Sequence, residues 1–148
     1  MPLIVAAVDG SEQSRRALIW ALRYTAGRDA SVQAVMAVNT ENLDEQDRRA
    51  RLDEAERIVS GMVVKAVVAC PRPPTVTREV VEGDPSGVLV DATHRAELIV
   101  FGSHRVSSIG NPALSTVSLA CIRMGTCPVR VIPAGAPEPA RCGDLVPT

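Results

Sequence analysis

The stretch that decides the fold is ELIVFGSHRVSSIGNPALSTVSLACIRMGTCPVRVIP, residues 97–133. A short apolar run, Leu98–Phe101, ends in Gly102 and Ser103, and a polar loop follows it. The pattern predicts a helix that opens at Ser115-Thr116, and a second apolar run, Val129–Ile132, closes the unit. Strand, small-residue loop, helix start and strand form an arrangement that is typical of phosphate-holding α/β proteins.

The same alternation extends back to the start of the chain. Apolar runs at residues 3–8 and 31–38, and the alternating pattern of residues 75–81, predict three more strands. Helical spacing of apolar residues predicts the intervening helices, which run from Ser11 to about Ala26, from about Glu41 to Val68, and from about Ser86 to Arg95. Strict alternation predicts one α/β domain over residues 1–133, a five-stranded parallel sheet with helices on both faces in a Rossmann-like nucleotide-binding architecture. Residues 134–148, rich in Pro and Gly, are expected to be a disordered tail.

Composition narrows the function classes. The 148 residues carry a formal net charge of −1 and include three aromatic residues, Trp20, Tyr24 and Phe101. Near-neutral charge and scarce aromatics argue against nucleic-acid binding. The cysteines and histidines lack zinc-ligand spacing, so no metal site is predicted.

No apolar run approaches the length of a membrane span and no basic leader precedes Leu3, so we expect a cytoplasmic protein without a membrane partner. The alternating charges of residues 44–57 predict a solvated helix face.

Candidate functional residues follow two of the predicted strands. Ligands of open α/β sheets bind beyond the carboxyl ends of the strands, where Asp9 and the pair Gly102-Ser103 are expected. Asp9 can accept hydrogen bonds from an amine or hydroxyl, Gly102 lets backbone approach a ligand, and Ser103 offers a hydroxyl. The helix start offers further hydroxyls and anion-facing amides at Ser115, Thr116, Val117 and Ser118.

Each of these features also has a purely structural interpretation. Asp-Gly-Ser after a strand is a common turn and helix cap, and Gly102-Ser103 can simply turn the chain. Serine and threonine inside a helix often bond only to preceding carbonyls. Asn111-Pro112 is an alternative helix start, which would remove Ser115 from the first-amide position.

Three segments together resemble the universal stress protein family: VAAVDGSEQSRRALIWAL, EGDPSGVLVDATHRAELIVFGSHR and CPVRVIP, spread over residues 3–133. The resemblance implies the strand order 3-2-1-4-5 and a homodimer. In that order the fifth strand lies at a sheet edge, and it is too apolar to leave exposed. We therefore expect pairing with a second copy through Pro128, Val129, Val131 and Ile132.

One branch of that family binds ATP through a pattern written G-x2-G-x9-G-[ST]. The first glycine and the final hydroxyl match Gly102 and Thr116, whereas Arg105 and Ser115 replace the other two glycines. The resemblance also places Asp9 at the nucleoside and the Ala37 backbone at the adenine. An arginine where a glycine has positive φ costs about 1 kcal/mol or more and fills space, although its cation is also able to bind a phosphate.

Three functions compete at this point. The first is a non-enzymatic stress-response regulatory or interaction protein with a degraded adenine-nucleotide site, and it has no catalytic residues. The second is a regulator that still binds ATP or another adenine nucleotide. The third is a weak ATP hydrolase, which the sequence favours least because it shows no positioned general base and no acidic cluster for Mg²⁺ besides Asp9.

Overall fold

The computed structural model describes residues 2–103 and 115–133. Within them, five strands alternate with four helices. The strands are β1 (Leu3–Ala7), β2 (Ser31–Val38), β3 (Thr75–Glu82), β4 (Leu98–Gly102) and β5 (Val129–Ile132). The helices are α1 (Glu12–Thr25), α2 (Glu45–Val68), α3 (Pro85–Thr93) and α4 (Thr116–Met124). The expected tail, residues 134–148, lies outside the described residues.

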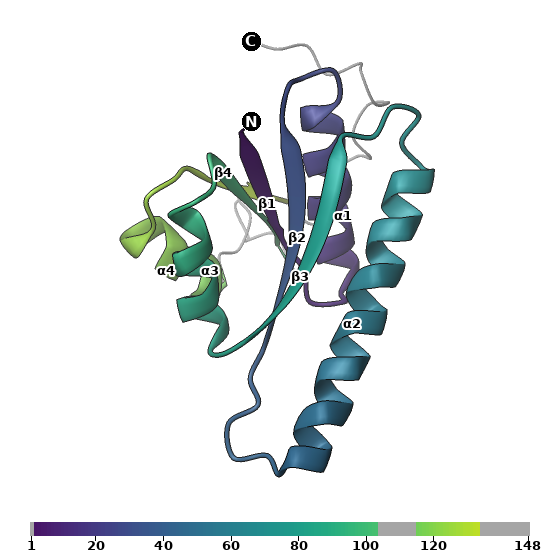
Figure 1. Cartoon of the computed structure of the whole chain (residues 1–148). Helices are drawn as coiled ribbons and strands as arrows, with labels where there is room; N and C mark the ends of the chain where they lie inside the picture. The colour runs from purple at the N-terminus through teal and green to yellow at the C-terminus, as the bar shows by residue number, and fades with distance from the viewer. Residues whose placement is uncertain (1, 104–114, 134–148) are drawn as a thin grey trace.

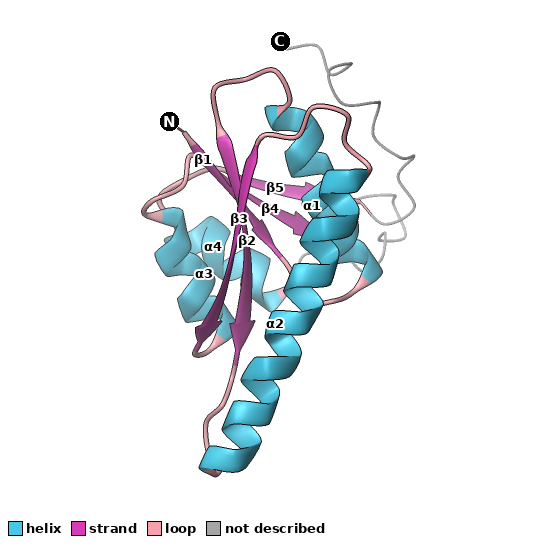
Figure 2. Ribbon diagram, turned by 45° about the vertical axis from the view of Figure 1, so that its right-hand side comes forward, coloured by secondary structure: helices cyan, strands magenta, loops and turns pink. Residues whose placement is uncertain are grey.

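All five strands are parallel and form one sheet in the order β3-β2-β1-β4-β5, which confirms the expected fold class. Helices α1 and α2 cover one face of this sheet, and α3 and α4 cover the other (Figures 1 and 2). β1 is the central strand. Alternate residues of β1 therefore enter different apolar layers: Ile4 packs with the layer under α1 and α2, and Val5 with the layer under α3 and α4. Burial on both faces explains why the strand is apolar throughout.

The start of α2 differs from the expectation. The sequence predicts a helix from about Glu41, but α2 begins at Glu45. Asp44 is its N-cap, with a carboxylate that accepts a hydrogen bond from the Asp47 amide at 2.8 Å. Asn42 has φ of 65°, which no helical residue adopts, so the chain turns before it enters the helix. A loop of residues 39–44 thus separates β2 from α2.

The third helix is also shifted slightly. It runs from Pro85 to Thr93, whereas the sequence predicts about Ser86 to Arg95. Asp84 caps it through a hydrogen bond from the Gly87 amide at 3.3 Å, and Pro85 occupies the first helical position, where a missing N–H costs nothing. The cap fixes where α3 leaves the carboxyl end of β3.

Candidate functional site

A cleft of about 230 Å³ opens at the carboxyl edge of the sheet, where β1 ends before its two neighbours. β1 leads into α1 on one face of the sheet and β4 leads towards α4 on the other, and open α/β sheets form a crevice at such a point. The walls come from strand ends, helix starts and α3. They are formed by Ala7, Val8, Asp9, Ser11, Ser14, Ala37, Pro85, Leu89, Phe101, Gly102, Ser115 and Val117.

Asp9 lies at the exposed mouth of the cleft, in the turn between β1 and α1. Its Oδ1 accepts a hydrogen bond from the Ser11 amide at 2.9 Å, and its own amide donates to Ser14 Oγ at 3.2 Å. Ser11 in turn caps α1 by accepting from the Ser14 amide at 3.1 Å. Gly10 supplies the positive φ of 87° that this turn requires. The Asp-Gly-Ser segment is therefore a turn and a cap, and it also presents a carboxylate to the cleft.

Ala37 contributes backbone groups to the opposite wall. The Val35 carbonyl accepts a hydrogen bond from the Val8 amide at 3.0 Å, so the peptide groups of Val35 face β1. Alternate residues of a strand direct these groups to the same side. Those of Ala37 therefore also point towards β1, but at a level where β1 has already ended. One N–H and one C=O are thus directed into the cleft.

Gly102 occupies the corresponding position on β4. The amides of Ile99 and Ser103 donate to the carbonyls of Pro128, just before β5, and Ile132, the last residue of β5, at 3.1 and 2.9 Å. Because neighbouring residues of a strand direct their peptide groups to opposite sides, those of Gly102 face the end of β1. The first turn of α1 lies directly against Gly102. A Cβ at this position would overlap the carbonyl carbon and oxygen of Gln13. Glycine is required here by close packing, and not by an unusual φ.

The start of α4 forms the remaining wall. Ser115 is the N-cap, in an extended conformation, and its Oγ accepts from the Ser118 amide at 3.0 Å. The remaining amides of the first turn belong to Thr116 and Val117, and such amides favour an anion. The helix starts where the serine-threonine pair predicts. The alternative start at Asn111-Pro112 lies outside the described residues, as does Arg105.

The predicted site residues therefore separate into two groups. Asp9, Ala37, Gly102, Ser115 and Val117 line the cleft. Ser103, Thr116 and Ser118 do not line it: Thr116 is exposed, whereas Ser103 and Ser118 are buried at 2% and 1% exposure. The Ser118 hydroxyl donates to the Ser115 carbonyl at 3.0 Å, as the structural interpretation requires.

The side chains that close the cleft from the α3 side were not among the residues predicted from the sequence. Pro85 and Leu89 come from α3, and Phe101 from β4. Helical spacing marks Leu89 as inward-facing, but it does not tell at which height α3 crosses the sheet. Alternation along β4 did indicate that Ser103 is buried. Its side chain lies on the same face of the sheet as that of Phe101, the face that α3 and α4 cover.

Two further findings concern the described residues. They contain no group of three or more His, Cys, Asp or Glu side chains that is able to hold a metal ion. None of their helices combines the length and apolar character needed to cross a membrane.

The sequence profile of the universal stress protein family matches residues 2–133. This chain belongs to that family. A universal stress protein of Mycobacterium tuberculosis is 30% identical over 97% of this chain and 52% of its own length. The chain thus spans about half the length of the curated relatives it matches.

Solved universal stress proteins share the fold. A family member from Burkholderia pseudomallei is 27% identical, with a TM-score of 0.68 over 89% of this chain and 96% of its own. The Archaeoglobus fulgidus universal stress protein in complex with dAMP is 21% identical, with a TM-score of 0.66 over 89% of this chain and 97% of its own.

Proposed function

We propose that this universal stress protein is a non-enzymatic stress-response regulator, and that its carboxyl-edge cleft binds an adenine nucleotide weakly. The observation that carries the proposal is the arrangement of Asp9 between the backbone groups of Ala37 and Gly102 in one cleft. The complex of the Archaeoglobus fulgidus relative with dAMP supports an adenine nucleotide as the ligand class. The proposed compartment is the cytoplasm.

The base would lie against Ala37. An adjacent N–H and C=O match adenine, which offers a ring nitrogen as acceptor beside its amino group as donor. Guanine in the same pose would set a donor against the N–H and an acceptor against the C=O, leaving buried polar groups unpaired. Apolar side chains of Val8, Leu89 and Phe101 provide a surface for the flat ring.

The sugar and phosphate would lie between Asp9 and α4. The Asp9 carboxylate can accept from a ribose hydroxyl, and the Thr116 and Val117 amides can face one phosphate group. Arg105 and Ser115 replace glycines of the ATP-binding pattern, so we propose weaker binding of the triphosphate than of the monophosphate. The competing proposal is that Arg105 binds phosphate, in which case Arg105→Gly combined with Ser115→Gly would weaken ATP binding.

Thermal shift tests the nucleotide proposal. AMP at 100 times its Kd should stabilise the fold by about 2.7 kcal/mol, which raises the Tm by roughly 5–10 °C. GMP at the same concentration should raise it far less. The Asp9→Asn variant keeps an oxygen that can accept from the Ser11 amide but loses the charge, so it should fold normally and bind AMP less tightly.

Two outcomes would contradict the nucleotide proposal: no shift with millimolar AMP or dAMP, or equal shifts with AMP and GMP. Release of phosphate from ATP that depends on Mg²⁺ would instead favour the hydrolase. ATP binding as tight as AMP binding would show that the substitutions at Arg105 and Ser115 do not degrade the site.

We also propose that the protein is a homodimer through β5. β5 is an edge strand of the described sheet, and Val129 and Val131 are only half-buried. The neighbouring helix α4 exposes Ile122 and Met124, at 49% and 62%. An isologous pairing through Pro128, Val129, Val131 and Ile132 would protect both edges at once.

A further inference from the structure

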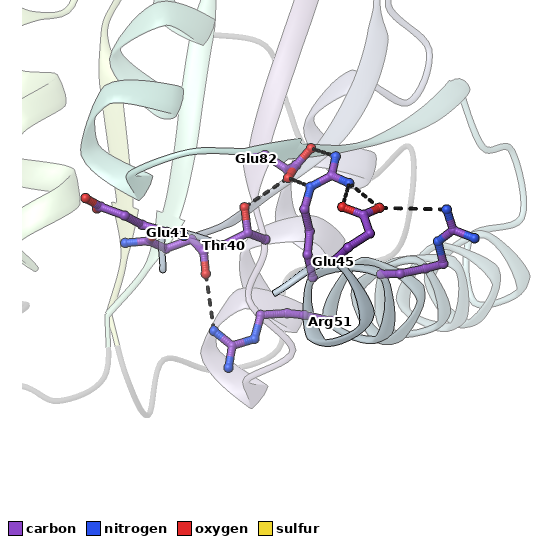
Figure 3. A network of polar contacts seen from close by, with 8 residues as sticks. Thr40, Glu41, Glu45, Arg51 and Glu82 are labelled. Carbon is purple, nitrogen blue, oxygen red and sulfur yellow. Dashed lines mark hydrogen bonds and ion pairs between the residues drawn. The ribbon is translucent and has the colours of Figure 1, made fainter. Parts of the chain in front are cut away.

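A polar network fastens the carboxyl ends of β2 and β3 to the start of α2 (Figure 3). At its centre is Glu82, the last residue of β3. Its Oε1 and Oε2 accept from Arg48 Nε and Nη2 at 2.6 and 2.7 Å, and Thr40 Oγ1 donates to Oε1 at 2.9 Å. We call these three residues the Glu82 clamp. It joins the end of β3 to a loop residue and a helix residue that lie 42 and 34 positions earlier in the sequence.

Further contacts hold the same loop, residues 39–44, from the α2 side. Arg51 Nη1 donates to the Asn39 carbonyl at 3.2 Å, and the Glu41 amide donates to Asn39 Oδ1 at 3.0 Å. Glu45 accepts from Arg48 Nη1 at 3.2 Å and so orients the clamp arginine from the first turn of α2. Figure 3 shows Arg51 directed at the loop, and Glu45 directed at arginine side chains of α2. These contacts tie the loop at its β2 end, and the Asp44 cap ties it to α2 at the other end.

The clamp lies next to two walls of the cleft. Thr40 is three residues after Ala37, and Glu82 is three residues before Pro85, and both Ala37 and Pro85 line the cleft. The Gly83 amide also donates to the Val38 carbonyl at 3.0 Å, which joins the two chain segments between the clamp and the walls. A shift of the loop would consequently move the peptide groups of Ala37.

The clamp is charged at neutral pH. The hydrogen bond from Arg48, and then the one from Thr40, hold the pKa of Glu82 below its ordinary value. The side chains of Arg48 and Glu82 remain 38% and 37% exposed. Exposed ion pairs add little to stability, whereas two parallel bonds to one carboxylate fix geometry well. Such a network is better suited to positioning than to holding the fold together.

We propose that the Glu82 clamp positions the wall formed by Ala37 and Pro85, and thereby sets the nucleotide affinity of the cleft. The clamp residues act through that wall, and none of them touches the cleft itself. This inference rests on the proposed nucleotide function, and it assigns to β3 and α2 a role at a site to which neither contributes a lining residue.

The test is Glu82→Gln, which keeps the size of the side chain and removes its charge. Loss of an exposed bidentate pair should weaken AMP binding by about two- to fivefold, measured by calorimetry. Hydrogen exchange of the amides in residues 37–43 should quicken, while the Tm without ligand changes little. Arg48→Met added to Glu82→Gln should weaken AMP binding no further, because the pair is already broken.

Glu54→Gln is the matched control. It removes the same charge from an ion pair, with Arg57 on α2, that touches neither cleft wall. Two results would overturn the proposed role of the clamp. One is equal AMP affinity in Glu82→Gln and Glu54→Gln, and the other is unchanged amide hydrogen exchange of residues 37–43 in Glu82→Gln. If the wild type itself binds no AMP, the nucleotide proposal fails, and hydrogen exchange alone then decides whether the clamp positions the wall.

Discussion

The Gly102→Ala variant should lose about 1–3 kcal/mol of unfolding free energy, or more, together with nucleotide binding. The added Cβ would overlap the Gln13 carbonyl group at the start of α1. Backbone cannot rotate away as a long side chain can, so α1 must move off β4 or the end of β4 must bend. Either shift also moves the Asp9 turn that α1 carries. Urea unfolding and AMP titration measure both effects.

Gly87→Ala is the control for this change. Gly87 is in α3, is exposed, and has nothing within 4 Å of an added Cβ. Alanine is favoured over glycine in a helix, so this variant should be as stable as the wild type or up to about 1 kcal/mol more stable. Wild-type stability and AMP affinity in Gly102→Ala would mean that the contact between α1 and β4 does not shape the cleft.

The second large effect concerns assembly. Val129→Asp combined with Val131→Asp should raise the dimer dissociation constant about a hundredfold or more, since each protomer would bring two unpaired charges to the strand pairing. Light scattering at tens of micromolar should then report a dimer for the wild type and a monomer for the variant. Circular dichroism should show that the variant remains folded.

The opposite edge of the sheet offers a matched comparison. Thr75 and Thr77 are exposed on β3, the other edge strand. Thr75→Asp with Thr77→Asp therefore places the same charges on the edge that is not proposed to form the dimer. This control should stay dimeric. A monomeric wild type, or a β5 variant that remains dimeric, would count against β5 as the interface.

The strands were predictable because a parallel sheet covered on both faces imposes a simple pattern. Ile4 and Val5 enter opposite apolar layers, so no polar residue interrupts the run. The order of the strands was not contained in that pattern and came from the family resemblance. The start of α2 was missed because Glu41 suits a helix, although Asp44 followed by Asp47 is a capping signal.

The site was predictable only in part, for a related physical reason. Asp9 and Gly102 follow directly from the rule that ligands lie beyond the carboxyl ends of strands. The walls from α3 depend on how the helix crosses the sheet, which short-range patterns do not encode. Arg48 and Glu82 are 34 residues apart, and the charges around Arg48 predicted only a solvated helix face. Their pairing is visible only once β3 and α2 are placed side by side.

The central claim is that an adenine nucleotide binds between the ends of β2 and β4. Backbone NMR during an AMP titration tests it most directly, because it reports on each amide separately. The account predicts saturating shifts at Ala37, Gly102 and Val117, with little change at Gly61 and Lys65 in the C-terminal half of α2. Unchanged spectra at millimolar AMP, or shifts confined to residues 57–65, would contradict it.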